Sequence, residues 1–534
     1  MTDMILDRYH PTPTTPRAAA GLAGWLLSGA VVLFSASISR AQVEAPPDGL
    51  GEAGRQSPDE TAQAQADWDL VSAYERVVGR AIARAEKSVV SIARNKVQSP
   101  EPLGPDPRGI PFRFRRSSAP LDPRDPEFVP NQFGTGVVVD PSGLVVTNYH
   151  VVDKDSEHYV TTIDRKVFKM RIKAADPRSD LAVLEVAPDE ANKPREGDFV
   201  PIVLGDADEL KKGETVIALG NPYAIARDGQ VSASRGIVAN LSRKVGLPAS
   251  AEDEVRTLHN FGTLIQTDAK LNLGTSGGAL INLRGEMVGL TTALAATAGY
   301  EMAAGYAIPV DETFRRVLDT LKKGREVEYG FLGIAPLYID SRDVHRGVRG
   351  IKVGTVSSGT PARVFGINEM DRITHIDGVP IYEPDGLRLH VGKLPPRATA
   401  RLTVERRNGR TDSLDVVLSK YRVRGEKIVT ERPPAWRGLR LDFPTAVVRD
   451  DLLEEFHNHC LAVSEVEPDS PAWKAGLRPA GNSYTAYTGV LISHVGTTPV
   501  TDPGDFYRAV ADEPGRVRLT VVNHGEVSFV VVDP

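Results

Sequence analysis

The sequence predicts a mainly β protein whose strand-rich first half is followed by two copies of one small domain. Three observations indicate this fold class. Short apolar runs separated by turn residues fill the first half, motifs return after about 120 residues in the second half, and 534 residues exceed one ordinary domain. Hydrophobic residues make up 41% and charged residues 25% of the chain, as in a globular protein.

The strand-like runs begin at residue 88. They are SVVSIA (88–93), GTGVVVD (134–140), GLVVTN (143–148), DLAVLEV (180–186), TVIALG (215–220), GIVANLS (236–242) and EMVGLTTAL (286–294). Because no helical period lies between them, they favour an antiparallel barrel or sandwich. Helical spacing is found before the runs, at Val71, Tyr74, Val78 and Ile82, and after them, at Phe314, Val317, Leu318 and Leu321.

The second half of the chain repeats itself. The repeated pairs are ITHIDGVPI (373–381) with ISHVGTTPV (492–500), GTPARVFGI (359–367) with DSPAWKAGL (469–477), and RLTV at 401–404 and 518–521. This period is too long for a solenoid repeat. We therefore expect two copies of one small β-rich domain, joined by a charged linker.

An uncharged apolar segment at 18–39 precedes the strand-rich region. Arginines lie before it, and Ser39 and Ala41 form a small-x-small cleavage site, as in a secretory signal peptide. The length also fits an uncleaved membrane anchor, and a buried core helix is the alternative. We interpret 1–41 as a signal peptide or membrane anchor and 42–66, which has few large apolar groups, as a flexible linker.

Charge and cysteine content exclude several classes of protein. The net charge of −6 over the whole chain argues against a dedicated nucleic-acid binder. The single cysteine, Cys460, excludes an intrachain disulfide framework. HNHC at 457–460 lacks a fourth ligand at close spacing, so we interpret it as a loop before a strand and expect no metal. Nothing resembles a P-loop, so we expect neither ATP nor another cofactor.

The segment LNLGTSGGAL at 271–280 places Ser276 among glycines. Glycine allows backbone conformations that side chains forbid, and it lets another chain approach closely. The segment is either a flexible turn or the site of a nucleophilic serine. A nucleophilic serine requires a histidine base and a carboxylate that orients the base.

His150 and Asp180 are the candidates for base and carboxylate. His150 follows the apolar run in GLVVTNYHVV, where a strand would present it at the rim of a barrel, although a lone histidine is often structural. Asp180 directly precedes the run in DLAVLEV, a position where many aspartates only stabilise a turn. Four other histidines lie in polar sequence without strand context, namely His10, His158, His259 and His345.

Five motifs resemble, in order and spacing, the HtrA/Deg family of trypsin-like serine proteases. They are GTGVVVDPSGLVVTNYHVV, DPRSDLAVLEV, ALGNPY, IQTDAKLNLGTSGGAL and GYAIPV. The resemblance implies a protease domain at 67–325 with a chymotrypsin-like double β-barrel. Two small α+β PDZ-like domains would follow at 326–420 and 435–534, with the linker at 421–434.

The resemblance also implies a role for each candidate. His150 would be the general base, Asp180 the orienting carboxylate and Ser276 the nucleophile. The N–H groups of Gly274 and Ser276 would form the oxyanion hole.

Some positions depart from the patterns of related proteases. In the family's Gly-Asn-Ser-Gly-Gly-Pro segment, Thr275 replaces Asn and Ala279 replaces Pro, and both flank the chemistry without supplying it. Lys270 and Leu271 stand where trypsin-like enzymes place an aspartate that attracts basic side chains, and the family's pocket tends to accept small aliphatic ones.

Two further segments carry alternative interpretations. The Pro- and Arg-rich insertion between Asn95 and Asn131 is either a solvated loop or a segment that reaches a neighbouring subunit. WRGLRL at 436–441 matches the family's carboxylate-binding loop poorly, because Arg437 replaces a large apolar residue, so the second PDZ-like domain either binds peptides or has a scaffolding role. In the first domain YGFLGI matches this loop, and the resemblance implies that peptides bind at Phe331, Leu332, Gly333 and Ile334.

The leading hypothesis is an exported, ATP-independent serine endopeptidase that degrades unfolded or damaged proteins in the periplasm, either free or anchored to the membrane. The rival hypothesis is a peptide-binding scaffold or chaperone with a silent protease domain. The expected partners are misfolded proteins and peptide C-termini, not nucleic acid. The resemblance further implies a homotrimer or higher oligomer, with Trp68 and Tyr74 as candidate contacts.

Overall fold

The computed structural model describes residues 58–96, 132–189, 192–221, 229–244, 257–272, 274–292, 304–447, 459–479, 490–523 and 526–534. The signal peptide or anchor expected at 1–41 lies outside these residues, as does most of the insertion between Asn95 and Asn131. Within the described ranges, no helix is both long and apolar enough to cross a membrane. The chain divides into two compact units, Met1–Asp67 and Trp68–Pro534.

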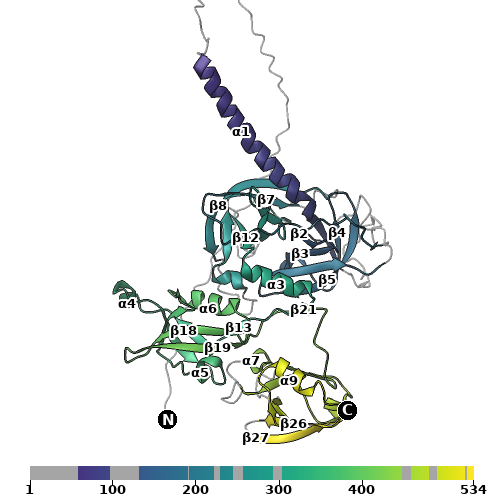
Figure 1. Cartoon of the computed structure of the whole chain (residues 1–534), viewed down its shortest axis with the longest axis vertical. Helices are drawn as coiled ribbons and strands as arrows, with labels where there is room; N and C mark the ends of the chain where they lie inside the picture. The colour runs from purple at the N-terminus through teal and green to yellow at the C-terminus, as the bar shows by residue number, and fades with distance from the viewer. Residues whose placement is uncertain are drawn as a thin grey trace, which may run out of the picture. The chain divides into compact units, whose positions relative to one another are not determined.

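The first described element is helix α1, Pro58–Ala85 (Figure 1). The expectation of a flexible linker as far as residue 66 is therefore wrong from Pro58 onward. Residues 58–66 contain no large apolar side chain, but a proline in the first turn followed by Ala, Gln and Glu still favours a helix. The helical spacing noted up to Ile82 is confirmed, and Ala81 and Ala85 are buried against the strand-rich region.

Six strands form a first barrel. They are β1 (Val89–Lys96), β2 (Gln132–Asp140), β3 (Leu144–Asn148), β4 (Ser156–Thr161), β5 (Val167–Asp176) and β6 (Leu181–Val186). Their order is β5-β4-β1-β2-β3-β6, and an additional pairing between β5 and β6 closes the sheet. The sequence runs predict four of these strands but not β4 and β5.

A second closed barrel follows, in the order β10-β11-β12-β9-β8-β7. Its strands are β7 (Thr215–Gly220), β8 (Ser232–Arg243), β9 (Leu264–Thr267), β10 (Ala279–Ile281), β11 (Met287–Thr292) and β12 (Gly305–Pro309). Helix α3 (Glu312–Lys322) comes next, and the carboxylate of Asp311 caps it by accepting the N–H of Phe314 at 2.8 Å. The expected double β-barrel and its closing helix are confirmed, and the four apolar side chains expected on one face of α3 are buried.

The core of the double barrel continues past residue 325. Val327, Tyr329 and Val423 are buried in it together with the apolar face of α3. The phenolic O–H of Tyr329 donates to Asp176 at 2.5 Å. Residues assigned from the sequence to the next domain and its linker therefore complete the core of the barrels.

The two repeats share one strand order. The first is β14-β15-β16-β18-β19, with β17 paired to β16, and the second is β22-β23-β24-β26-β27, with β25 paired to β24. The repeated motifs occupy equivalent places, since His375 pairs with Pro380 as His494 pairs with Pro499. The expectation of two copies of one domain is confirmed.

The elements of the repeats are short. The first repeat contains β13 (Gly330–Phe331), β14 (Ile334–Leu337), α4 (Ser341–His345), β15 (Ile351–Val356), α5 (Pro361–Val364), β16 (Arg372–Ile376), β17 (Val379–Pro380), α6 (Pro384–Lys393), β18 (Thr399–Glu405), β19 (Thr411–Val417) and β20 (Ser419–Lys420). The second contains β22 (Leu439–Asp442), α7 (Pro444–Val447), β23 (Leu461–Val466), α8 (Pro471–Lys474), β24 (Leu491–Val495), β25 (Thr498–Pro499), α9 (Pro503–Val510), β26 (Val517–Asn523) and β27 (Glu526–Val532).

The linker expected at 421–434 contains a strand, β21 (Ile428–Val429), which pairs with β5 of the first barrel. Cys460 lies directly before β23 and exposes 3% of its surface. Burial raises the pKa of its thiol to about 11.

Candidate active site

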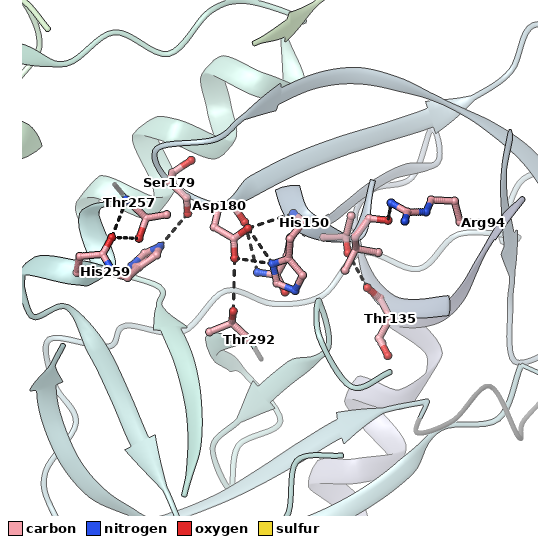
Figure 2. A network of polar contacts seen from close by, with 12 residues as sticks. Arg94, Thr135, His150, Ser179, Asp180, Thr257, His259 and Thr292 are labelled. Atoms are coloured by element: carbon pink, nitrogen blue, oxygen red, sulfur yellow. Dashed lines mark hydrogen bonds and ion pairs between the residues drawn. The ribbon is translucent and has the colours of Figure 1, made fainter. Parts of the chain in front are cut away.

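His150 lies in a short 3-10 turn, η2 (Tyr149–Val151), directly after strand β3. Its Nδ1 lies 2.9 and 3.0 Å from the two carboxylate oxygens of Asp180. The side chain of His150 remains 32% exposed, whereas that of Asp180 is 3% exposed. Figure 2 shows the carboxylate of Asp180 in contact with one ring nitrogen of His150. A buried carboxylate thus fixes one nitrogen of an imidazole that is itself partly exposed.

The backbone of Asp180 also holds it in place. Its φ of +54° lies in the left-handed region, which aspartate adopts more readily than most residues. Its main-chain carbonyl accepts the N–H of Tyr149 at 2.9 Å, and its carboxylate accepts the N–H of His150 at 3.2 Å. Thr292, at the end of β11 in the second barrel, donates its hydroxyl to the same carboxylate at 3.4 Å. Both barrels therefore orient Asp180.

A second histidine supports the loop that carries Asp180. His259, in the 3-10 turn η5 (Leu258–Phe261), contacts the carbonyl of Ser179 through Nε2 at 2.8 Å and the hydroxyl of Thr263 through Nδ1 at 2.7 Å. Burial lowers the pKa of His259, which keeps it neutral, so Nε2 is the donor and Nδ1 the acceptor. The carboxylate of Asp176 accepts both the N–H and the hydroxyl of Ser179, at 2.8 and 2.6 Å.

Thr135 connects the Ser276 loop to the first barrel. Its N–H donates to the carbonyl of Ser276 at 2.9 Å, and its hydroxyl donates to the carbonyl of Gly274 at 2.7 Å. Its own carbonyl accepts the hydroxyl of Thr147 at 2.7 Å. Because Thr147 lies on the strand that leads to His150, one residue links the serine loop to the histidine strand.

Positions 274 and 277, on either side of Ser276, require glycine for steric reasons. Gly274 and Gly277 have φ values of +97° and +83°, which side chains rarely adopt. A Cβ on Gly277 would lie 2.1 Å from the carbonyl oxygen of Thr135, and a Cβ on Gly274 would lie 2.6 Å from that of Asn221. The segment is therefore a tightly fitted loop rather than a flexible turn.

Thr275 takes part in the turn where the family has Asn. Its hydroxyl donates to the carbonyl of Asn272 at 2.7 Å, and its carbonyl accepts the hydroxyl of Thr291 at 2.5 Å. The next residue along β11, Thr292, contacts Asp180. The turn before Ser276 is thus fixed by the same strand that orients the carboxylate.

The structure brings His150 and Asp180 into contact and places the Ser276 loop beside them. Gly134 marks the meeting point: a Cβ there would lie 2.6 Å from the side chain of Val151 and 3.5 Å from the carbonyl oxygen of Ser276. The His150–Asp180 pair of the first barrel and the Ser276 loop of the second therefore lie where the two barrels adjoin.

Several charges act on the pKa of His150. Burial lowers it, but the charge of Asp180 and the hydrogen bond to it outweigh burial, so the pKa of His150 is raised above 6.5. The guanidinium of Arg94 opposes this rise. Arg94 is 8% exposed and donates to the carbonyl of Val151 at 3.2 Å.

The expectation that His158 lies in polar surroundings without strand context is wrong. It belongs to β4 and is 2% exposed. Burial and the nearby Arg94 lower its pKa to about 4. Neutral His158 accepts the N–H of Asp153 at 3.3 Å, so it supports the turn after His150.

The four residues expected to bind peptides line a groove of the first repeat. The groove has a volume of about 160 Å³ and lies between β14 and helix α6, with Arg178, Leu387, Val391 and Tyr421 also on its wall. Gly333 has a φ of +89°, and a Cβ on it would lie 2.2 Å from Thr360. Because β14 is the edge strand of its sheet, a peptide strand could add beside it.

Sequence reasoning missed the residues that support the site. Thr135, His259 and Thr292 act through contacts with residues far away in the chain, such as His259 with Ser179. Their polarity inside apolar runs was the available signal, because a polar side chain in a barrel interior needs a partner.

Comparisons with known proteins agree with this geometry. The family model described as "Trypsin-like peptidase domain" matches residues 134–290. A "Probable periplasmic serine endoprotease DegP-like" from Pseudomonas putida (strain W619) is 30% identical over 446 residues, which cover 80% of this chain and 85% of the relative.

Two further similarities were found. The "Putative serine protease HhoA" from Synechocystis sp. is 33% identical over 358 residues, covering 64% of this chain and 83% of the relative. A solved structure described as "HtrA-type protease AlgW with tripeptide" is 22% identical and superposes with a TM-score of 0.47, covering 67% of this chain and 98% of that one. On its identity to the Pseudomonas relative over most of both chains, this chain belongs to the DegP-like, HtrA-type family of serine endoproteases.

Proposed function

We propose that this serine endopeptidase cleaves unfolded or damaged proteins with His150, Asp180 and Ser276 as its catalytic triad. The observation that carries the proposal is the contact of His150 Nδ1 with both oxygens of the buried Asp180 carboxylate, beside the serine loop. Asp180 holds the proton on Nδ1, so Nε2 is the basic nitrogen that faces the reaction.

The mechanism follows from these positions. Ser276 Oγ attacks the carbonyl carbon of the scissile peptide bond while His150 Nε2 takes the hydroxyl proton. The same proton then passes to the leaving amine, and a water molecule activated by His150 hydrolyses the acyl-enzyme. The N–H groups of Gly274 and Ser276 stabilise the oxyanion, a contribution of about 3 kcal/mol per donor.

The groove of the first repeat supports a second part of the proposal. Phe331, Leu332, Gly333 and Ile334 surround a space beside an edge strand, so the first repeat would capture peptide C-termini or exposed peptide segments of substrates. We further propose export to the periplasm, in line with the apolar segment at 18–39 and with the name of the Pseudomonas relative. Assembly into trimers or larger oligomers belongs to the same proposal.

The Ser276→Ala variant tests the triad. Its kcat on casein should fall by roughly 10⁶-fold, while binding of unfolded protein persists. Ser142→Ala, at a turn serine with its own hydrogen bond to Asp140, is the matched control and should keep full activity. Wild-type protein that binds casein without cutting it would instead support a scaffold or chaperone with a silent protease domain.

The pH dependence of kcat/KM identifies the base. An imidazolium cannot accept the serine proton, so activity should fall as the pH drops through the pKa of His150, with a midpoint above 6.5 because Asp180 raises that pKa. Arg94→Met removes an opposing charge and should move the midpoint to higher pH. A profile that is flat down to about pH 4.5 would contradict His150 as the base.

A further inference from the structure

The segment that joins the two repeats does not only span the distance between them. Residues 421–431, here called the strap, run along the first barrel. Within the strap, Ile428 and Val429 form β21, which pairs antiparallel with β5, Ile428 opposite Ala175 and Val429 opposite Ala174. β5 is the strand that ends at Asp176, at the start of the loop leading to Asp180.

Both ends of the strap are anchored. At one end, the N–H of Tyr421 donates to the carbonyl of Tyr329 at 2.7 Å, and the guanidinium carbon of Arg178 lies 3.9 Å from the centre of the Tyr421 ring. At the other end, the N–H groups of Thr430 and Glu431 donate to the carbonyl of Gly324 at 3.0 and 2.9 Å. Because both ends of the strap are held, β21 in its middle is kept in one register against β5.

The middle of the strap reaches the histidine turn. The phenolic O–H of Tyr149 donates to the carbonyl of Glu426 at 3.0 Å. The ammonium of Lys154, four residues after His150, pairs with the carboxylate of Glu426 at 2.5 Å. Ile428 packs against the apolar cluster of the first barrel that also contains Val151.

The strap therefore touches both loops of the catalytic pair. It contacts the residue before His150 through a hydrogen bond, and it forms the edge partner of the strand that precedes the Asp180 loop. β4 pairs with β5 only as far as Met170, so β21 takes the side of Ala174 and Ala175 that β4 leaves open. Without β21 the backbone groups on that side of β5 would have no strand partner. A shift of about 1 Å in a catalytic group is enough to lower the rate about a hundredfold.

We propose that the strap is a positioning element for the His150–Asp180 pair, with Tyr149 and Ile428 as its positioning residues. The inference rests on the proposed function of that pair. It assigns the segment between the repeats a role in the rate of the chemical step, whereas substrate capture belongs to the groove of the first repeat. Release of the strap lowers kcat and leaves KM almost unchanged.

The first test is Tyr149→Phe in the full-length chain. This change removes one hydroxyl and keeps the ring, so kcat on a short chromogenic peptide should fall about 3- to 10-fold with KM and the melting temperature unchanged. Tyr159→Phe is the matched control, because its hydroxyl donates to Glu157 on the same strand, β4, and its loss should not affect kcat. A Tyr149→Phe enzyme with wild-type kcat would overturn the role of this hydrogen bond.

The second test releases the strap itself. Ile428→Asn should lower kcat at least 10-fold and make the strap cleavable by trypsin at Arg424 and Lys427. Ile428→Val retains the apolar contact and should keep both the wild-type kcat and the resistance to trypsin. Val527→Asn, on the exposed edge strand β27, is the control and should change neither. Faster trypsin cleavage of the strap at wild-type kcat would overturn the proposal. Failure of the wild-type enzyme to cut any peptide would instead count against the triad.

Discussion

The two repeats have the same strand order but differ in what fills the space beside the edge strand. In the first, Leu332 is 4% exposed and packs into the core, and an open groove of about 160 Å³ remains between β14 and α6. In the second, the equivalent residue is Arg437, whose guanidinium donates to the carbonyls of Val532, Glu513 and Gly515. The same loop geometry thus lines an open groove in one copy and holds an arginine that bonds to three carbonyls of its own domain in the other.

The aromatic residue before this position shows the same contrast. Phe331 lines the groove of the first repeat, and its ring centre lies 6.1 Å from that of Tyr421. Trp436, its counterpart, packs edge-on against Phe506 of α9 at 5.5 Å. Phe506 is fully buried, so the indole packs over the core of the second repeat. Among the described residues, the aromatic side chain at this position thus lines a groove in the first repeat and packs on the core in the second.

The repeats also differ in how they are attached. The first is continuous with the barrel core through Tyr329 and pairs Lys393 with Asp311 of the barrel region at 2.9 Å. The contacts of the second with the rest include Lys420, whose ammonium lies 2.8 Å from Asp442 and 2.9 Å from Glu328. Lys420 is 3% exposed, so this contact is a buried ionic one.

Lys420→Met should produce the largest change in this comparison. It leaves the carboxylates around the site without their shared cation, and loss of one partner of a buried ion pair costs about 3–5 kcal/mol. Calorimetry should show a lower melting temperature for the second repeat. Lys427→Met is the control, because its half-exposed pair with Glu326 should contribute under about 1 kcal/mol. Equal effects of the two changes would show that the buried lysine is not the main attachment.

Trp436→Ala should destabilise the second repeat by about 3 kcal/mol, since truncation of a large aromatic leaves a cavity over Phe506. Denaturant titration followed by Trp473 fluorescence would measure the change. Trp68→Ala, at a residue 67% exposed on α1, should alter stability by less than about 0.5 kcal/mol. If Trp436→Ala proves neutral, the indole lies over an empty groove rather than over the core.

Phe331→Ala should weaken peptide binding by about tenfold, because it removes an aromatic wall of the groove. Fluorescence polarisation with a labelled peptide that ends in an apolar residue and a free carboxylate gives the affinity. Tyr382→Ala, at an exposed residue of the same repeat, should have no effect. Equally tight binding by the amidated peptide would contradict recognition of a C-terminus.

The smallest expected effect is a loss of attachment in acid. Burial raises the pKa of Glu326, but Lys420 and Lys427 outweigh it and hold the pKa below 4.5. The stabilisation by Glu326 is therefore present above pH 4.5 and is lost as the pH falls through the lowered pKa. The melting temperature of the second repeat, followed between pH 6 and 3, should show this decline, and Glu326→Gln should flatten it.

The sequence predicts much of this molecule because its signals are local. The order of His150, Asp180 and Ser276, the glycines around the serine and the apolar face of α3 can all be read from short segments. β5 was missed because its exposed positions carry Lys169 and Arg171, which alternate with the buried Phe168 and Met170. The alternation itself was the available signal.

Other features have no local signal. β21 consists of Ile428 and Val429, and it is a strand only because β5 offers an edge more than 250 residues earlier in the chain. The roles of His259 and Thr135 likewise depend on partners from distant elements. The positive φ of Asp180 follows from contacts with the histidine turn, which no single run of residues reveals.

The shielding of Cys460 has a practical consequence for spectroscopy. The thiolate is the form that reacts with maleimides, and a buried thiol with a pKa of about 11 supplies almost none of it at neutral pH. Because Cys460 is the one cysteine in 534 residues, a cysteine introduced on an exposed site would be the sole position to accept a dye. Pairs of such labels, one on each repeat, would report distances between them in the native chain without prior removal of any thiol.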